Sequence, residues 1–164
     1  MKHISLTLLL LMLVGTVTGA DLTNARWYTI RVGNGGYLST ASGYKNGVCL
    51  LLDNMTEDAS DAGLWTFIGD ETDGYSFYNK ARGEKYVLGM SGTEANGRAK
   101  MVLTTNTTNV TKFDMGKNGE GFWIKDHGSD NKYWNKRGNY LAYWDNAAGS
   151  TDTGSRFIFT IQGI

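Results

Sequence analysis

The sequence predicts an all-β protein. Short runs rich in Val, Ile, Tyr, Phe, Trp and Thr alternate with glycine and asparagine turns from residue 21 onwards. No segment carries a sustained helical period of apolar residues. The chain holds 22 glycines and no proline, which indicates tight turns made by glycine, asparagine and aspartate. A pattern of four strands occurs three times, and this repeat organises the analysis of the chain.

The first twenty residues are expected to be a signal peptide and not part of the fold. Lys2 and His3 precede the apolar run ISLTLLLLMLVG, and the small residues TVTGA lead to cleavage after Ala20. A membrane anchor needs about 20 apolar residues, which this run does not supply. The mature chain, 21–164, has the length of a single domain and is expected to be secreted, periplasmic or extracellular.

The net charge of the chain and its cysteine content exclude several binding partners and an internal disulfide. The chain has 16 basic and 16 acidic side chains, so loss of Lys2 with the signal leaves 15 against 16, a net charge of −1. Nucleic acid and anionic membranes require a basic surface, so neither is an expected partner. Cys49 is the one cysteine, which excludes an internal disulfide. Its apolar surroundings predict a buried inert thiol, with an intermolecular bridge or a reactive thiol as the alternatives.

The repeat is visible in the strands that open each unit. YTIR, YSFY and FWIK begin 47 residues apart, at residues 28, 75 and 122. The third strands end alike, in CLLLDN, MVLTTN and LAYWDN, and the closing strands are LWTF, KFDM and RFIF. The expected units are residues 27–70 (unit one), 74–118 (unit two) and 121–162 (unit three).

Three units of four strands resemble a β-trefoil, in which six strands close a barrel and six form hairpins that cap it. A propeller is the competing fold, because its blades are also four-stranded, but propellers usually have at least four blades. Within the trefoils, the segment CLLLDNMTEDASDAGLWTF, residues 49–67, resembles the strand, loop and Q-x-W closing strand of the ricin B-type lectins. The glutamine of that motif is replaced in all three units, by Gly63, Thr111 and Ser155.

Alternation along the strands predicts which side chains face the core. Large apolar residues recur at alternate positions of the closing strands and of the third strands, and we expect both sets to be buried: Trp65, Phe67, Phe113, Met115, Phe157 and Phe159, and Cys49, Leu51, Met101, Leu103, Leu141 and Tyr143. In the stretch YWNKRGNYLAYW, residues 133–144, a tight RGN turn is expected between two strands. Trp134 is then directed to the core with Tyr143, while Tyr140 and Trp144 are directed outward.

The resemblance to ricin-type lectins implies a sugar site in unit three. In that family the third strand ends in an aromatic residue on which a sugar ring stacks, and Trp144 is the aromatic residue at this place, where the other units have Leu52 and Thr104. Burying one face of an indole against a pyranose contributes on the order of 1–3 kcal/mol. We expect Asp145, Asn146 and Asp152 to supply polar contacts, and Tyr140 and Arg137 to extend the surface.

Catalytic and metal-dependent functions are not expected. His127 is the one histidine of the mature chain, and a solvated turn is the favoured interpretation of its surroundings. The loops DHGSD and DNAAGSTD lack the spacing of a calcium-binding loop. We therefore expect no enzyme activity, no cofactor and no metal. The N-x-T sequons begin at Asn54, Asn106 and Asn109.

The primary hypothesis is a secreted protein that binds a carbohydrate or glycoconjugate weakly through unit three. The alternative is a protein-binding domain, either a secreted protease inhibitor that uses the loop 41–47 or an adhesive module without a defined sugar ligand. The orientation of Trp144 is the most useful single observation for the sugar hypothesis. A half-exposed indole near Asp145, Asn146 and Asp152 favours a sugar site, and a buried one favours packing.

Overall fold

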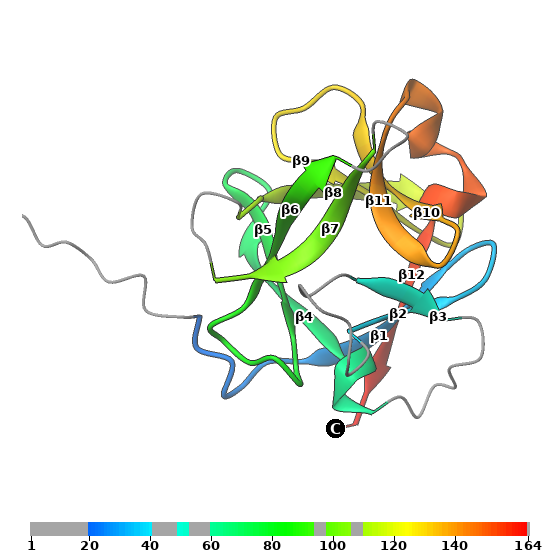
Figure 1. Cartoon of the computed structure of the whole chain (residues 1–164). Coiled ribbons are helices and arrows are strands. Elements are labelled where there is room, and N and C mark those ends of the chain that lie inside the picture. The colour runs from blue at the N-terminus through cyan, green and yellow to red at the C-terminus, as the bar shows by residue number, and fades with distance from the viewer. Residues whose placement is uncertain (1–19, 41–48, 53–59, 94–97, 106–109, 164) are drawn as a thin grey trace, which may run out of the picture.

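The computed structural model describes residues 20–40, 49–52, 60–93, 98–105 and 110–163 (Figure 1). Within these residues the chain forms twelve strands and three short 3₁₀ helices, which confirms the all-β prediction. The strands are β1 (Trp27–Val32), β2 (Tyr37–Ser39), β3 (Leu50–Leu52), β4 (Trp65–Asp70), β5 (Gly74–Asn79), β6 (Val87–Thr93), β7 (Ala99–Thr104), β8 (Phe113–Asn118), β9 (Gly121–Asp126), β10 (Lys132–Arg137), β11 (Tyr140–Asp145) and β12 (Phe157–Gln162). The 3₁₀ helices are η1 (Asp61–Gly63), η2 (Ala147–Ser150) and η3 (Thr153–Ser155).

All twelve described strands belong to one antiparallel sheet. Its order is β10-β11-β3-β2-β1-β12-β9-β8-β5-β6-β7, and a pairing of β11 with β7 closes ten of these strands into a barrel. The other two strands lie outside this circuit, where β4 pairs with β1 and β5 while β10 pairs with β9 and β11.

This topology corrects the predicted β-trefoil with its six-stranded barrel and hairpin cap. Each third strand pairs with the second strand of its own unit, and the three third strands also bond to one another. Cys49 donates its backbone N–H to Met101 O over 3.1 Å, and Leu141 donates its N–H to Cys49 O over 2.9 Å. The sequence pattern predicts pairing between strands that are neighbours in the chain. It does not predict the pairing of β11 with β3 and β7, which closes the barrel.

The predicted division of faces is confirmed. All twelve residues that were expected in the core belong to the apolar cluster of the structure or pack against it. Leu52 and Trp144, at equivalent ends of β3 and β11, are partly exposed. Cys49 is fully buried, and burial raises the pKa of its thiol, which disfavours the reactive thiolate. β1, β5 and β9 begin at residues 27, 74 and 121, which preserves the 47-residue spacing.

The predicted turn between the strands of unit three is also confirmed. Arg137 pairs with Tyr140, so β10 and β11 are joined by a two-residue turn of Gly138 and Asn139. Gly138 has a φ of 60°, a conformation that glycine adopts without steric cost. The short turn fixes the register of β11 and therefore the direction of its outward side chains.

Two indoles lie fully buried but differ in their hydrogen bonding. Trp65 Nε1 donates to Leu38 O over 2.8 Å. Trp134 packs against the rings of Phe77, Phe113 and Phe157, and its Nε1 has no hydrogen-bond partner in the described part of the chain. Both side chains have 0% exposure, so they form a matched pair for measuring the contribution of one buried hydrogen bond.

We expect Trp65→Phe to destabilise the protein more than Trp134→Phe, by about 1–3 kcal/mol. Both substitutions remove similar apolar volume, but only the first leaves a buried carbonyl, that of Leu38, without its donor. Urea unfolding followed by far-UV circular dichroism measures the difference. Equal losses of stability would show that the Leu38 carbonyl finds another partner.

Candidate functional site

Trp144 lies near the end of β11 and is partly exposed. It pairs with Tyr133 of β10, so both side chains lie on the outer face of this hairpin. Tyr140 is four residues earlier on the same strand, shares this face and is also partly exposed. The structure therefore brings the two aromatic rings of the predicted site onto one surface.

Two cations from unit two lie over these rings. The guanidinium carbon of Arg98 is 5.8 Å from the centroid of the Trp144 ring, and Lys100 Nζ is 4.9 Å from the centroid of the Tyr140 ring. They reach this place because β7 pairs with β11, with Lys100 opposite Ala142. Both distances are within the range of about 6 Å for cation–π attraction. We call Arg98, Lys100, Tyr140 and Trp144 the aromatic–cationic face.

Asn135 connects this face to the loop before β12. It accepts a hydrogen bond from Arg98 Nη1 over 3.2 Å, and its own Nδ2 donates to Ser155 Oγ over 2.9 Å and to Asp152 Oδ2 over 3.3 Å. Asn135 is buried on β10, opposite Ala142. Sequence reasoning missed this residue and both cations. Alternation along β10 places Asn135 on the same face as Trp144, so the sequence pattern could have predicted the position of this residue.

Two of the predicted polar partners begin 3₁₀ helices. Asn146 Oδ1 accepts the N–H of Ala148 over 2.9 Å at the start of η2, and Asp152 Oδ2 accepts the N–H of Gly154 over 2.8 Å at the start of η3. Such caps satisfy backbone donors that the first turn leaves unpaired. These side chains therefore shape the loop 146–155, and Asp152 is linked to the aromatic–cationic face through Asn135.

Asp145 faces away from Trp144. Neighbouring residues of a strand alternate between its faces, and Asp145 pairs with Lys132. Together with Asp126, His127 and Asp130, these two residues line a polar depression of about 460 Å³. The structure thus separates Asp145 from the two rings with which it was predicted to act.

Buried polar groups lie beneath this depression. Asp126 Oδ1 and the Tyr143 hydroxyl make no hydrogen bond of good geometry among the residues that the structure describes, but the two side chains lie close enough to affect each other's pKa. Burial raises the pKa of Asp126, although Tyr143 and Lys132 act in the opposite direction. Burial also raises the pKa of Tyr143, and the neighbouring carboxylate raises it further. His127 Nδ1 lies 2.7 Å from Asp114 Oδ1, so the exposed turn histidine has a hydrogen-bond partner.

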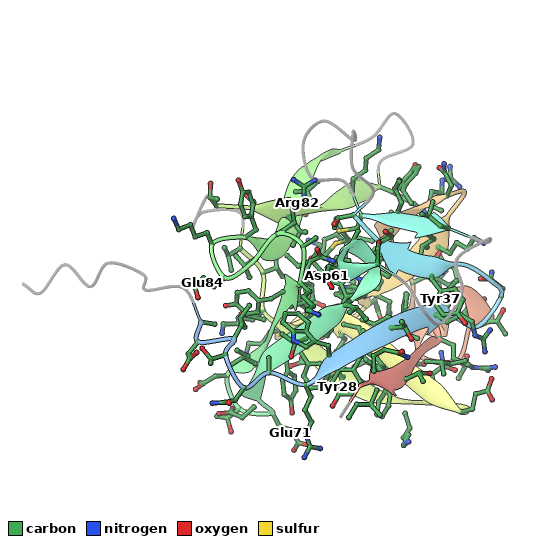
Figure 2. The ribbon with its side chains drawn as sticks, turned by 90° about the horizontal axis from the view of Figure 1, so that it is seen from below. Tyr28, Tyr37, Asp61, Glu71, Arg82 and Glu84 are labelled. Carbon is green, nitrogen blue, oxygen red and sulfur yellow. The ribbon has the colours of Figure 1, made fainter. Side chains whose placement is uncertain are left out.

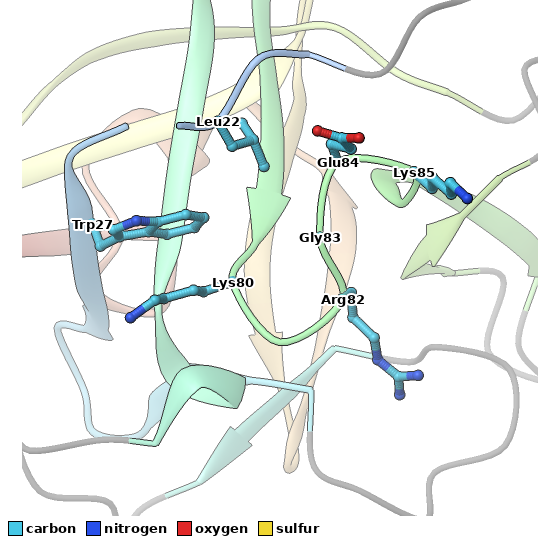
Figure 3. Close-up of a pocket in the computed structure, with 7 residues that line it drawn as sticks. All are labelled: Leu22, Trp27, Lys80, Arg82, Gly83, Glu84 and Lys85. Carbon is cyan, nitrogen blue, oxygen red and sulfur yellow. The ribbon is translucent and has the colours of Figure 1, made fainter. Parts of the chain in front are cut away.

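A second depression, of about 410 Å³, lies between the N-terminal segment and the loop 80–85. Figure 2 shows Glu84 beside the N-terminal segment. In Figure 3, Trp27 and Lys80 lie next to each other, whereas Arg82 and Lys85 point away from the indole. Lys80 also forms an ion pair of 3.0 Å with Asp61. Lys80 therefore has two partners at this depression, the Trp27 ring and the Asp61 carboxylate.

Other features of the sequence remain predictions. Several predicted features lie outside the described residues, namely residues 1–19 of the signal peptide, the loop 41–47, Asp53, Asn54, Asn106 and Asn109. Within the described ranges, no three His, Cys, Asp or Glu side chains gather in a way that could hold a metal ion. Those ranges also contain no helix of the length and apolar character that would cross a membrane.

Comparisons with known proteins show a likeness of structure. No protein-family model and no curated protein sequence matches the chain. The chain is similar in structure to the Rhizoctonia solani agglutinin, with a TM-score of 0.64 and 14% identity over 84% of this chain and 96% of that one. It is also similar to a mosquitocidal holotoxin, with a TM-score of 0.63 and 12% identity. That match covers 85% of this chain but 18% of the holotoxin chain.

The likeness is one of fold. At these identities the comparisons show that the chain shares a β fold with an agglutinin and with part of a holotoxin. They assign no residue of this chain to a ligand.

We expect Asp126→Asn to stabilise the protein at neutral pH and to have little effect near pH 3. Burial raises the pKa of Asp126 in the folded state, and the unfolded value is about 3.9. As pH rises above the unfolded pKa, the unfolded state loses its proton first, so the wild-type protein loses stability that the variant retains. Urea unfolding at the two pH values measures this difference.

Asp130→Asn is the control, because Asp130 lines the same depression but is exposed. An Asp126→Asn variant that is less stable than the wild type at neutral pH would show instead that the carboxylate supports the fold.

Proposed function

We propose that this protein is a secreted carbohydrate-binding protein that holds a sugar weakly on Trp144 of unit three. The observation that carries the proposal is the position of Trp144, which is partly exposed near the end of β11 and on the same outward face as Tyr140. A fully buried indole would have favoured a packing role. Its fold, shared with an agglutinin, supports this assignment, as does the resemblance of residues 49–67 to the ricin B-type lectins.

The chemistry of the site is that of a stacking platform. A pyranose has an apolar C–H face, and an indole covers that face while the sugar hydroxyls remain available for hydrogen bonds. Burial of this area contributes on the order of 1–3 kcal/mol, which suits weak and reversible binding. The protein acts in this proposal by binding and not by catalysis.

The loop 146–155 supplies the polar contacts in this proposal. Asn146 and Asp152 each use one side-chain oxygen in a cap, and the Asn146 amide nitrogen and the second Asp152 oxygen are not part of those caps. An amide donor and a carboxylate acceptor suit vicinal hydroxyls, which both donate and accept. Asp145, on the other face of the strand, contributes only to a ligand long enough to pass around its end.

We expect Trp144→Ala to weaken glycan binding about 5- to 150-fold, which corresponds to the loss of 1–3 kcal/mol of stacking. Leu52→Ala is the matched control, because Leu52 is the partly exposed residue at the equivalent end of β3 in unit one. A glycan array identifies a bound saccharide, and calorimetry then measures the affinity of each variant.

Thermal unfolding confirms that both variants fold. An equal loss of affinity in the two folded variants would exclude Trp144 as the platform. A partner protein that is recovered equally in the presence of competing sugars would favour the protein-binding alternative.

A further inference from the structure

We propose that the aromatic–cationic face selects saccharides that carry a carboxylate, with Arg98 and Lys100 as the residues that determine this specificity. The inference rests on the proposed function, because it concerns the ligand that stacks on Trp144. The inference adds that the bound sugar must carry a negative charge. The two residues that recognise this charge come from unit two, whereas the ring on which the sugar stacks comes from unit three.

Each of the two aromatic rings of the face has a cation next to it. Arg98 lies over the Trp144 ring at 5.8 Å, and Lys100 lies over the Tyr140 ring at 4.9 Å. The two cations are alternate residues next to and within β7, so they share one face of the strand. A pyranose on Trp144 with an exocyclic carboxylate would therefore have a cation at the margin of the stacking surface.

Arg98 is held in a fixed orientation by the groups behind it. Its Nη1 donates to Asn135 Oδ1, and the Asn135 amide is itself fixed by Asp152 and Ser155. Asn135 is 7% exposed, so this support lies behind the surface and not in contact with a ligand. A guanidinium is a planar fork of N–H donors that matches the geometry of a carboxylate. Asn135 is accordingly a positioning residue.

Neither Asp145 nor Asp152 forms an ion pair with Lys100. Asp145 lies on the opposite face of β11, and Asp152 Oδ2 accepts from Gly154 and Asn135. Lys100 forms no ion pair within the described part of the chain. A ligand carboxylate thus approaches a surface that carries two cations beside two aromatic rings.

The experiment compares a neutral oligosaccharide with its counterpart that ends in a uronic acid. Calorimetric titration of the full-length protein gives the ratio of the two affinities at low salt and at high salt. We expect the wild-type protein to prefer the acidic sugar about three- to tenfold at low salt, and less at high salt, because salt screens exposed charges. Arg98→Gln and Lys100→Gln should each bring this ratio closer to one.

Lys117→Gln is the matched control. Lys117 Nζ lies 4.5 Å from the Phe122 ring centroid, so this substitution also removes a cation from an aromatic ring, but outside the face. The control should keep the wild-type ratio. Because Arg98→Gln disturbs a buried network, Lys100→Gln provides a second variant that does not touch Asn135, and thermal unfolding checks both.

The possible outcomes separate this inference from the function on which it rests. Equal affinity for the two sugars, with binding lost in Trp144→Ala, would overturn the charge requirement and leave the sugar site intact. An unchanged ratio in folded Arg98→Gln and Lys100→Gln would overturn the assignment to these residues, whatever happens to overall affinity. Binding of neither sugar, or binding that Trp144→Ala does not weaken, would overturn the proposed function together with the inference. A sulfated counterpart, titrated in parallel, shows whether the selection is for carboxylate or for negative charge in general.

Discussion

The hydrogen bonds between the third strands of the three units are the contacts on which the candidate site depends. Cys49 of unit one bonds through its backbone to Met101 of unit two and to Leu141 of unit three. Lys100 and Ala142, next to these residues, pair β7 with β11. Without these pairings the cations of β7 and the rings of β11 would belong to separate hairpins. Because the backbone makes the connection, the outward side chains are free to vary without loss of the junction.

The aromatic core holds the strands that carry this junction. Trp134 contacts Phe77, Phe113 and Phe157, one ring from each of three other strands, with centroid distances of 4.8, 5.1 and 5.5 Å. A buried aromatic residue contributes several kcal/mol through burial, and edge-to-face pairs add about 0.5–1.5 kcal/mol each. The indole N–H without a hydrogen-bond partner is a cost of this arrangement. Trp134, on the inner face of β10, thus anchors the strand in the core, and Asn135 lies on its outer face.

Sequence patterns predicted the local structure well and the long-range pairing poorly. Alternation correctly separated Tyr143, in the core, from the partly exposed Trp144, because the period of a strand is a local property. The same alternation implied that Asp145 faces away from Trp144, although this consequence was not used in predicting the site. The proximity of Arg98 to Trp144 could not have been predicted, because neither strand's sequence alone indicates that β7 pairs with β11. The closed ten-strand circuit was missed for the same reason.

Asn135 gives the aromatic–cationic face a mechanical connection to the end of the chain. Its amide joins Arg98, near the start of β7, to Asp152 and Ser155, just before β12. If a ligand binds as proposed, it would link Arg98 of unit two to Trp144 of unit three without a covalent bond, and the Asn135 amide would extend that restraint to the residues just before β12. Occupancy of the face would therefore resist separation of the repeats, and the ligand concentration would set how firmly the last strand is held in the barrel.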